Sequence, residues 1–114
     1  MSHRILQING LIRELLGEIL LREVNFKPGV LATISKVDTS PDLRNSRVYI
    51  SVLPENEFNY VLKTLRYERK RIQHELHGKL QMKPMPKISF EYDPTESRAD
   101  TVEKILKIID AESE

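Results

Sequence analysis

The sequence predicts an α+β fold, a single domain with a three-stranded mixed sheet and helices packed on one of its faces. Three segments carry apolar residues at steps of three and four, which is the period of an amphipathic helix. Three shorter stretches alternate apolar and polar residues instead, which is the period of a half-buried strand. At 114 residues, the chain is long enough for one packed core and too short for two.

The first predicted element is a helix over residues 2–23, with Ser2 as its N-cap. Its apolar stripe consists of Ile5, Ile8, Ile12, Leu15 and Ile19. Pro28 and Gly29 end the helix. Alternation then predicts strands over residues 30–38 and 47–53. The turn-forming residues between these strands predict an antiparallel hairpin with a long, exposed loop.

Residues 55–77 are predicted to be helical and to stop at Gly78, because glycine is favoured just beyond a helix C-terminus. Two nearby prolines then force an extended chain, and residues 87–93 alternate as a third strand. A strand that reaches a later strand through a helix normally runs parallel to it, so the third strand should lie parallel to the second, central one. We expect the face of the sheet without helices to be partly open to solvent or a partner. The last predicted helix has the apolar positions Val102, Ile105, Leu106 and Ile109.

An arginine interrupts the apolar stripe of the middle helical segment. The position between Leu65 and Ile72 that should continue the stripe holds Arg69. Three explanations are open: the guanidinium reaches water at the edge of the protein, a bend near residues 67–70 shifts the phase between two helices, or the period is misassigned. We favour the bend, because an unpaired guanidinium in the core would cost several kcal/mol. A second helix beginning there would place free N–H groups beside three cations, a corner that suits phosphate.

The net charge of +1 conceals an uneven distribution along the chain. Residues 1–62 are neutral in sum, residues 63–87 carry eight basic and two acidic side chains, and residues 88–114 carry three basic and eight acidic ones. The basic middle predicts a surface that faces a polyanion. The candidate contacts to such a polyanion are Lys63, Arg66, Arg69, Lys70, Arg71 and Lys79, extended by Arg44 and Arg47 on the hairpin. A solvated basic face without a ligand is the alternative.

Several classes of function are not expected. The absence of cysteine removes disulfides, thiolate nucleophiles and cysteine metal sites, and it fits a cytoplasmic protein. His74 and His77 have no third ligand nearby in the sequence, so we predict neither a metal site nor a cofactor. No Walker loop, nucleophile elbow or His-Glu metal motif occurs, so we do not expect an enzyme. No apolar run is long enough to cross a membrane, and the N-terminal stretch does not read as a signal peptide.

Three stretches of the sequence are distinctive when taken together: "INGLIRELLGEILLREV", "PGVLATISKVDTSPDLRNSRVYISVLP" and "PKISFEYDPTES". They resemble the ribosome-binding factor A family of bacterial small-subunit maturation proteins. The resemblance implies a type II KH-like RNA-binding domain over residues 1–111, in the order α-β-β-α-α-β-α, with residues 112–114 frayed. It also implies binding to immature 30S subunits and their 16S rRNA during late rRNA processing, with a role in cold adaptation.

The resemblance also places a kink between the two middle helices. The family's alanine-x-glycine kink falls on Glu68, Arg69 and Lys70, where the small residues are missing. The location agrees with the break in the stripe. We expect a monomer whose partners are the small ribosomal subunit and its rRNA. The alternative is a protein-interaction module or homodimer that uses the open sheet face or the first helix, with its charges serving only solubility.

Overall fold

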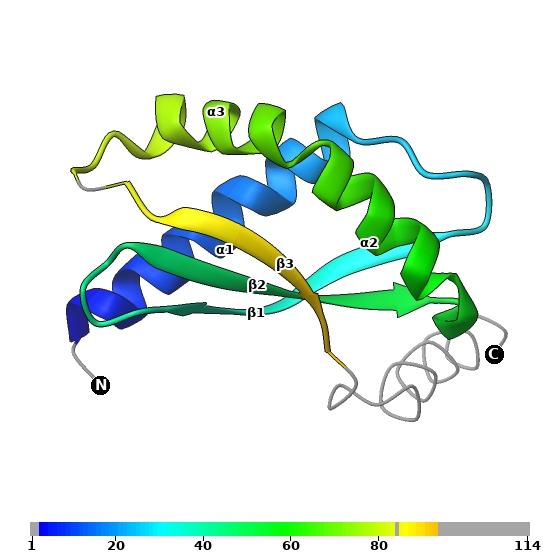
Figure 1. Cartoon of the computed structure of the whole chain (residues 1–114), viewed down its shortest axis with the longest axis horizontal. Helices are drawn as coiled ribbons and strands as arrows, with labels where there is room; N and C mark the ends of the chain where they lie inside the picture. The colour runs from blue at the N-terminus through cyan, green and yellow to red at the C-terminus, as the bar shows by residue number, and fades with distance from the viewer. Residues whose placement is uncertain (1–2, 84, 94–114) are drawn as a thin grey trace, which may run out of the picture.

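The computed structural model describes residues 3–83 and 85–93. In this part of the chain the elements follow the predicted order, and Figure 1 shows them as one α+β unit. They are α1 (His3–Glu23), β1 (Leu31–Thr39), β2 (Asn45–Leu53), the short 3-10 helix η1 (Glu55–Glu57), α2 (Phe58–Tyr67), α3 (Arg69–Leu80) and β3 (Lys87–Tyr92). Ser2, the predicted final helix and residues 112–114 lie outside the described residues.

The three strands form one mixed sheet with β2 at its centre. β2 runs antiparallel to β1 and parallel to β3, which confirms the predicted crossover through the helices. One face of the sheet is buried through residues such as Val48 and Ile50, while Arg47 and Lys36 remain exposed on the other face. A bulge between Ile34 and Lys36 adds one residue to the edge strand β1, and the pairing of β1 with β2 continues beyond it.

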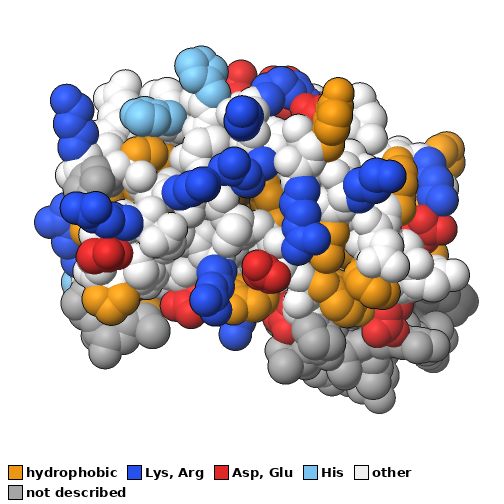
Figure 2. Space-filling model, viewed as in Figure 1, with side chains coloured by type: hydrophobic (Ala, Val, Ile, Leu, Met, Phe, Trp, Pro, Cys, Tyr) orange, Lys and Arg blue, Asp and Glu red, His pale blue; other side chains and the backbone are white. Residues whose placement is uncertain are grey.

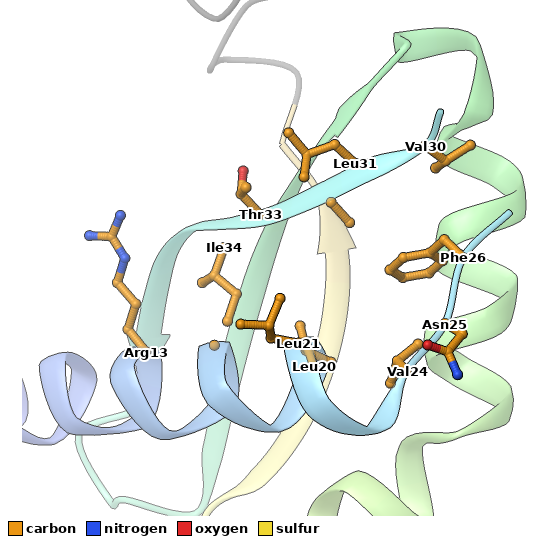
Figure 3. Close-up of a pocket in the computed structure, with 12 residues that line it drawn as sticks. Arg13, Leu20, Leu21, Val24, Asn25, Phe26, Val30, Leu31, Thr33 and Ile34 are labelled. Carbon is orange, nitrogen blue, oxygen red and sulfur yellow. The ribbon is translucent and has the colours of Figure 1, made fainter. Parts of the chain in front are cut away.

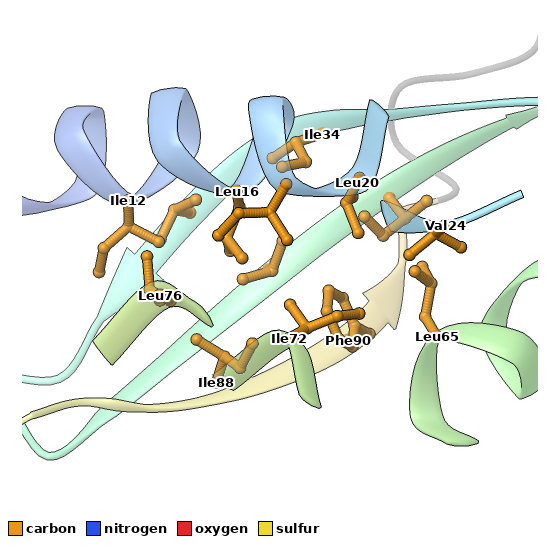
Figure 4. Close-up of a cluster of buried hydrophobic side chains, with 14 of the residues drawn as sticks. Ile12, Leu16, Leu20, Val24, Ile34, Leu65, Ile72, Leu76, Ile88 and Phe90 are labelled. Atoms are coloured by element: carbon orange, nitrogen blue, oxygen red, sulfur yellow. The ribbon is translucent and has the colours of Figure 1, made fainter. Parts of the chain in front are cut away.

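The three described helices cover the buried face and close the core (Figures 1 and 4). α1 packs on β1 and against α3, while α2 packs on β3. The fully buried side chains come from all of these layers and include Ile12, Leu16, Leu65, Ile72, Leu76, Ile88 and Phe90. Among the described residues, the outer surfaces of the helices and the other face of the sheet therefore remain for a partner.

The hairpin between β1 and β2 is tighter than the sequence predicts. β1 extends to Thr39 and β2 begins at Asn45, so the predicted long loop is wrong and only residues 40–44 connect the strands. Pairing continues because the turn satisfies its own polar groups: the Ser40 N–H donates to the Asn45 carbonyl at 2.8 Å. The hydroxyls of Thr39 and Ser46 also lie 2.8 Å apart as a buried hydrogen-bonded pair. Turn-forming residue types therefore marked the place of the connection but overstated its length.

The predicted stop at Gly78 is also wrong. α3 continues through this glycine, and its last residue is Leu80. Gln81 caps it in the left-handed conformation, with a φ of 47° and a ψ of 50°. The Gln81 N–H donates to the His77 carbonyl at 3.2 Å and closes the last turn. The additional residues bring Leu80 against the core. Packing of this leucine outweighs the local preference of glycine for the position after a helix.

A glutamine that the sequence analysis did not identify fixes α3 against the start of β3. The side-chain amide of Gln73 donates to the Pro86 carbonyl at 3.0 Å, and its carbonyl oxygen accepts from the Ile88 N–H at 2.8 Å. Both backbone groups lie at the start of β3, which is an edge strand of the described sheet and pairs with β2 on one side only. The position of α3 over the sheet is thereby tied to β3 by two directional contacts as well as by packing.

Candidate nucleic-acid interface

The helical segment that carries most of the cations is divided at one residue. α2 ends at Tyr67, α3 begins at Arg69, and Glu68 between them has a φ of −87° and a ψ of 2°. Figure 1 shows the change in direction at this junction. Backbone hydrogen bonding nevertheless continues across it, because the Glu68 N–H donates to the Thr64 carbonyl and the Ile72 N–H donates to the Glu68 carbonyl, each at 3.0 Å. The chain thus bends without glycine or proline.

The bend explains the arginine in the apolar stripe. Leu65 in α2 and Ile72 in α3 are both fully buried, whereas Arg69 is only half-buried. A single straight helix would place all three side chains on one stripe. With the change of direction at Glu68, two short stripes face the core and the arginine at the start of α3 lies between them. The predicted division into two helices is therefore confirmed, and it falls at the first of the three positions predicted for the kink.

Arg71 is engaged in a cluster that joins three segments of the chain. Its Nε donates to a Glu68 carboxylate oxygen at 2.6 Å, its Nη1 to the Glu23 carboxylate at 3.1 Å, and its Nη2 to the Glu23 backbone carbonyl at 3.0 Å. The hydrogen bond with Glu68 and then the nearby charge of Glu23 raise the pKa of Arg71. This cluster ties the C-terminal end of α1 to the helix junction. It also provides the Glu68 carboxylate with a positive partner.

Arg66 is directed toward the sheet. Its Nη2 donates to the Phe90 carbonyl at 3.1 Å and lies 3.8 Å from a Glu91 carboxylate oxygen. The guanidinium therefore links α2 to β3, although more than half of its side chain remains exposed. Arg66 and Arg71 share the basic segment with the other candidates, but Nη2 of Arg66 and all three guanidinium nitrogens of Arg71 already have partners in the chain.

The remaining cations of α2 and α3 have no such partner. Within residues 3–83 and 85–93, no hydrogen bond or ion pair joins Lys63, Arg69, Lys70 or Lys79 to another side chain. The three lysines are exposed. Figure 2 shows Lys and Arg side chains distributed over the face formed by α2, α3 and β3, with acidic side chains beside some of them. We refer to Lys63, Arg69 and Lys70 as the junction cations.

The two hairpin arginines form a separate group. Asp42 in the turn accepts hydrogen bonds from the Ser40 hydroxyl at 2.6 Å and the Arg44 N–H at 3.1 Å, and these contacts, the first above all, lower the pKa of Asp42. Arg47 lies opposite Asp38 on the open face of the sheet, and its pKa is raised by Tyr49 first and then by the neighbouring carboxylates. The predicted candidates therefore occupy two regions, the helix junction and the hairpin.

The structure allows a direct test of the different positions of Arg69 and Arg71. We expect Arg69→Ala to change the free energy of unfolding by less than about 1 kcal/mol, because the Arg69 side chain has no hydrogen bond or ion pair with another side chain among the described residues. Arg71→Ala should lower the melting temperature more, since it leaves Glu23 and Glu68 without their shared partner. Thermal unfolding of both variants followed by circular dichroism checks the order. A loss of more than about 3 kcal/mol in Arg69→Ala would show that this side chain is buried and paired.

A groove between α1 and β1 is a second candidate surface. Its volume is about 470 Å³, and Figure 3 shows apolar side chains along it with Arg13 at one end. Leu21 on α1 is 87% exposed and Leu31 on β1 is 53% exposed, which are high values for leucines that line the same groove. The first helix was predicted as a possible interaction surface, but the sequence did not indicate that β1 forms the other wall of this groove.

Neither a metal cluster nor a membrane-spanning helix occurs among the described residues. No group of three or more potential metal ligands occurs there, and His74 and His77 gain no third partner. No helix in the described part of the chain has both the length and the apolar character that crossing a membrane requires.

Comparisons with known proteins show the family. The family model described as ribosome-binding factor A matches residues 4–106. A ribosome-binding factor A from Christiangramia forsetii is 32% identical over 111 residues, which cover 93% of this chain and 84% of the relative. One from Chlamydia felis is 32% identical over 109 residues, covering 92% of this chain and 90% of the relative.

Solved structures agree in fold. The crystal structure of ribosome-binding factor A from Thermus thermophilus has a TM-score of 0.67 at 21% identity and covers 77% of this chain and 94% of its own. The solution structure of a Thermotoga maritima protein, described as a putative ribosome-binding factor A, has a TM-score of 0.66 at 27% identity and covers 80% and 88%. A Thermus thermophilus coordinate set fitted into a cryo-EM map of a 30S complex has a TM-score of 0.65 at 22% identity and covers 83% and 97%. Sequence and fold agree, and the chain belongs to the ribosome-binding factor A family.

Proposed function

We propose that this chain is a non-enzymatic maturation factor of the small ribosomal subunit. It binds immature subunits through their 16S rRNA in the cytoplasm during late rRNA processing, as a monomer, and it is needed most in the cold. Membership of the family supports the ribosomal partner. The Thermus relative fitted into a 30S map supports the small subunit as that partner. The single observation that carries the RNA contact is the set of junction cations, the exposed Lys63 and Lys70 and the half-buried Arg69, none of which has a side-chain partner among the described residues.

The arrangement of charges at the junction suits a phosphate backbone. Glu68 is the carboxylate closest in sequence to the junction cations, and Arg71 already neutralises it at 2.6 Å. Lys63 and Lys70 are therefore left to attract phosphate without competition from that group. In this proposal Arg71 and Arg66 hold the junction against α1 and β3, and Lys63, Arg69 and Lys70 make the RNA contacts. Lys79, Arg44 and Arg47 extend the contact area along α3 and on the hairpin.

The salt dependence of binding tests this proposal. Each phosphate neutralised by lysine or arginine contributes a slope of about −0.7 to −0.9 in log affinity against log salt. If at least four of these six side chains contact phosphate, raising salt from about 50 to about 200 mM should weaken binding by at least roughly 50-fold. The measurement is co-sedimentation of the chain with purified immature small subunits over a series of salt concentrations. Binding that does not change across this series would contradict an RNA-backbone contact.

A protein-interaction module is the second candidate, and the exposed leucines of the groove between α1 and β1 favour it. In that case Leu21→Glu would abolish association with subunits while charge changes at the helix junction would have no effect. The same variant leaves binding unchanged if the chain contacts rRNA through α2 and α3. Leu21 is 87% exposed, so replacing it does not disturb the core. The sedimentation coefficient of the free chain reports in the same experiments whether a homodimer forms.

A further inference from the structure

One tyrosine at the helix junction differs from the other three in the chain. Tyr67 is the last residue of α2, and it is 88% exposed. The chain has four tyrosines and no tryptophan, so any aromatic surface available to a partner must come from a few rings. Exposed single apolar residues are common on proteins and need no explanation by themselves. The comparison with the other tyrosines makes Tyr67 informative.

Each of the other tyrosine rings is engaged within the chain. Tyr60 packs edge-on against Phe26 with the centroids 6.2 Å apart, and its hydroxyl accepts from the Lys27 N–H at 3.0 Å. Tyr92 stacks on Phe58 at 4.6 Å, and its hydroxyl donates to Glu55 at 2.9 Å.

The Tyr49 ring carries the Lys36 ammonium 4.7 Å from its centroid. Tyr67 has no ring contact or hydrogen bond of this kind with the described residues. Both faces of its ring are therefore available.

The surroundings of this ring are cationic. Lys63 precedes Tyr67 by four residues, which places it one turn earlier along α2, and Lys70 follows in the first turn of α3. Both lysines are exposed and unpaired among the described residues, and the adjacent Glu68 carboxylate is bound by Arg71. A flat apolar surface between two free cations matches the two chemical parts of a nucleotide, the base and the phosphate. Proteins that bind single strands combine these two features.

We propose that Tyr67 is a stacking platform for one unpaired base of the RNA, with Lys63 and Lys70 on the adjoining phosphates. This inference rests on the proposed function and names the kind of RNA that the junction takes, a strand with at least one base outside a duplex. Stacking tolerates any base, because every base has a π-face. A tyrosine fixed on a helix has only two side-chain torsions to restrict, so little conformational entropy opposes the contact.

The experiment compares Tyr67→Ala and Tyr67→Phe on two probes. One probe is a mixed-sequence single-stranded RNA of about 12 nucleotides, which is the scale of one single-strand site. The other is the same strand annealed to its complement. Tyr67→Ala should bind the single strand about 5- to 150-fold more weakly, because it loses one stacked base, while Tyr67→Phe should retain most of the affinity. Binding of the duplex should be unchanged by either substitution, and the salt slope should be the same for all three proteins.

Crosslinking identifies the contact itself. Single strands with iodouridine at successive positions should form a photo-adduct on Tyr67, located by mass spectrometry. If Tyr67→Ala binds the single strand as tightly as the unmodified chain, the inference is overturned. If Tyr67→Ala instead weakens association with subunits but not with the single strand, the ring contacts a ribosomal protein, which also overturns it. If Lys63→Gln weakened binding in a salt-dependent manner and Tyr67→Ala did not weaken it, the proposed function would hold and the stacked base would be excluded.

Discussion

Replacing both Lys63 and Lys70 by glutamate is expected to abolish co-sedimentation of this chain with immature small subunits at moderate salt. Each substitution removes a contact to phosphate and puts a carboxylate in its place. Because like charges brought together at an interface cost several kcal/mol, the affinity should fall by at least about 100-fold. Both side chains are exposed and lack partners in the described structure, so the fold should tolerate the change.

The matched control for this double variant is Arg4→Glu with Arg13→Glu. It changes the net charge by the same amount on exposed positions of α1. Arg13 lines the groove between α1 and β1, and Arg4 lines a separate hollow with Leu80 and Met82. If the whole charge of the chain decided the binding, both variants would lose it equally. A loss confined to the lysine pair places the contact at the helix junction. A loss confined to the arginine pair would contradict that location and favour the groove between α1 and β1 as the binding surface.

The place of the junction was predictable from the sequence, because an arginine in a leucine stripe conflicts with burial. The stripe could be read locally, residue by residue. The division of labour among the cations could not. Arg71 finds Glu23 at a sequence separation of 48 residues, and Arg66 finds the Phe90 carbonyl at a separation of 24. Such partners depend on how α1 and β3 pack beside the junction, and no periodicity within a single helix reports that.

The errors in the predicted boundaries have the same origin. Local residue preferences predicted that the helix stops at Gly78 and that a long loop joins the first two strands. Packing of Leu80 on the core continued the helix. The buried hydroxyl pair of Thr39 and Ser46 continued the strands. Where a local preference of a few tenths to one kcal/mol meets the burial of a large side chain, burial decides.

Truncating Ile72 should cause the largest loss of stability among the single substitutions considered for the helix junction. This side chain is fully buried in the first turns of α3, and its N–H closes the hydrogen bond across the bend to the Glu68 carbonyl. We expect Ile72→Ala to lower the free energy of unfolding by about 2–5 kcal/mol, because it removes buried methyl groups and leaves a cavity. Ile72→Val should cost only about 0.5–1.5 kcal/mol. Urea denaturation followed by circular dichroism measures both values.

Measuring subunit binding of the same variants separates the role of Ile72 in the fold from the role of the junction cations in binding. Ile72 faces the core and the junction cations face outward, so Ile72→Val should bind small subunits with the affinity of the unmodified chain. The Lys63 and Lys70 double variant should show the reverse, with a near-normal unfolding midpoint and no binding. If Ile72→Ala lost less than about 1 kcal/mol, the stripe would not be buried on both sides of Glu68. The outward position of Arg69, Lys63 and Lys70 would then lose its physical basis, because it follows from the burial of Leu65 and Ile72 on either side of the bend.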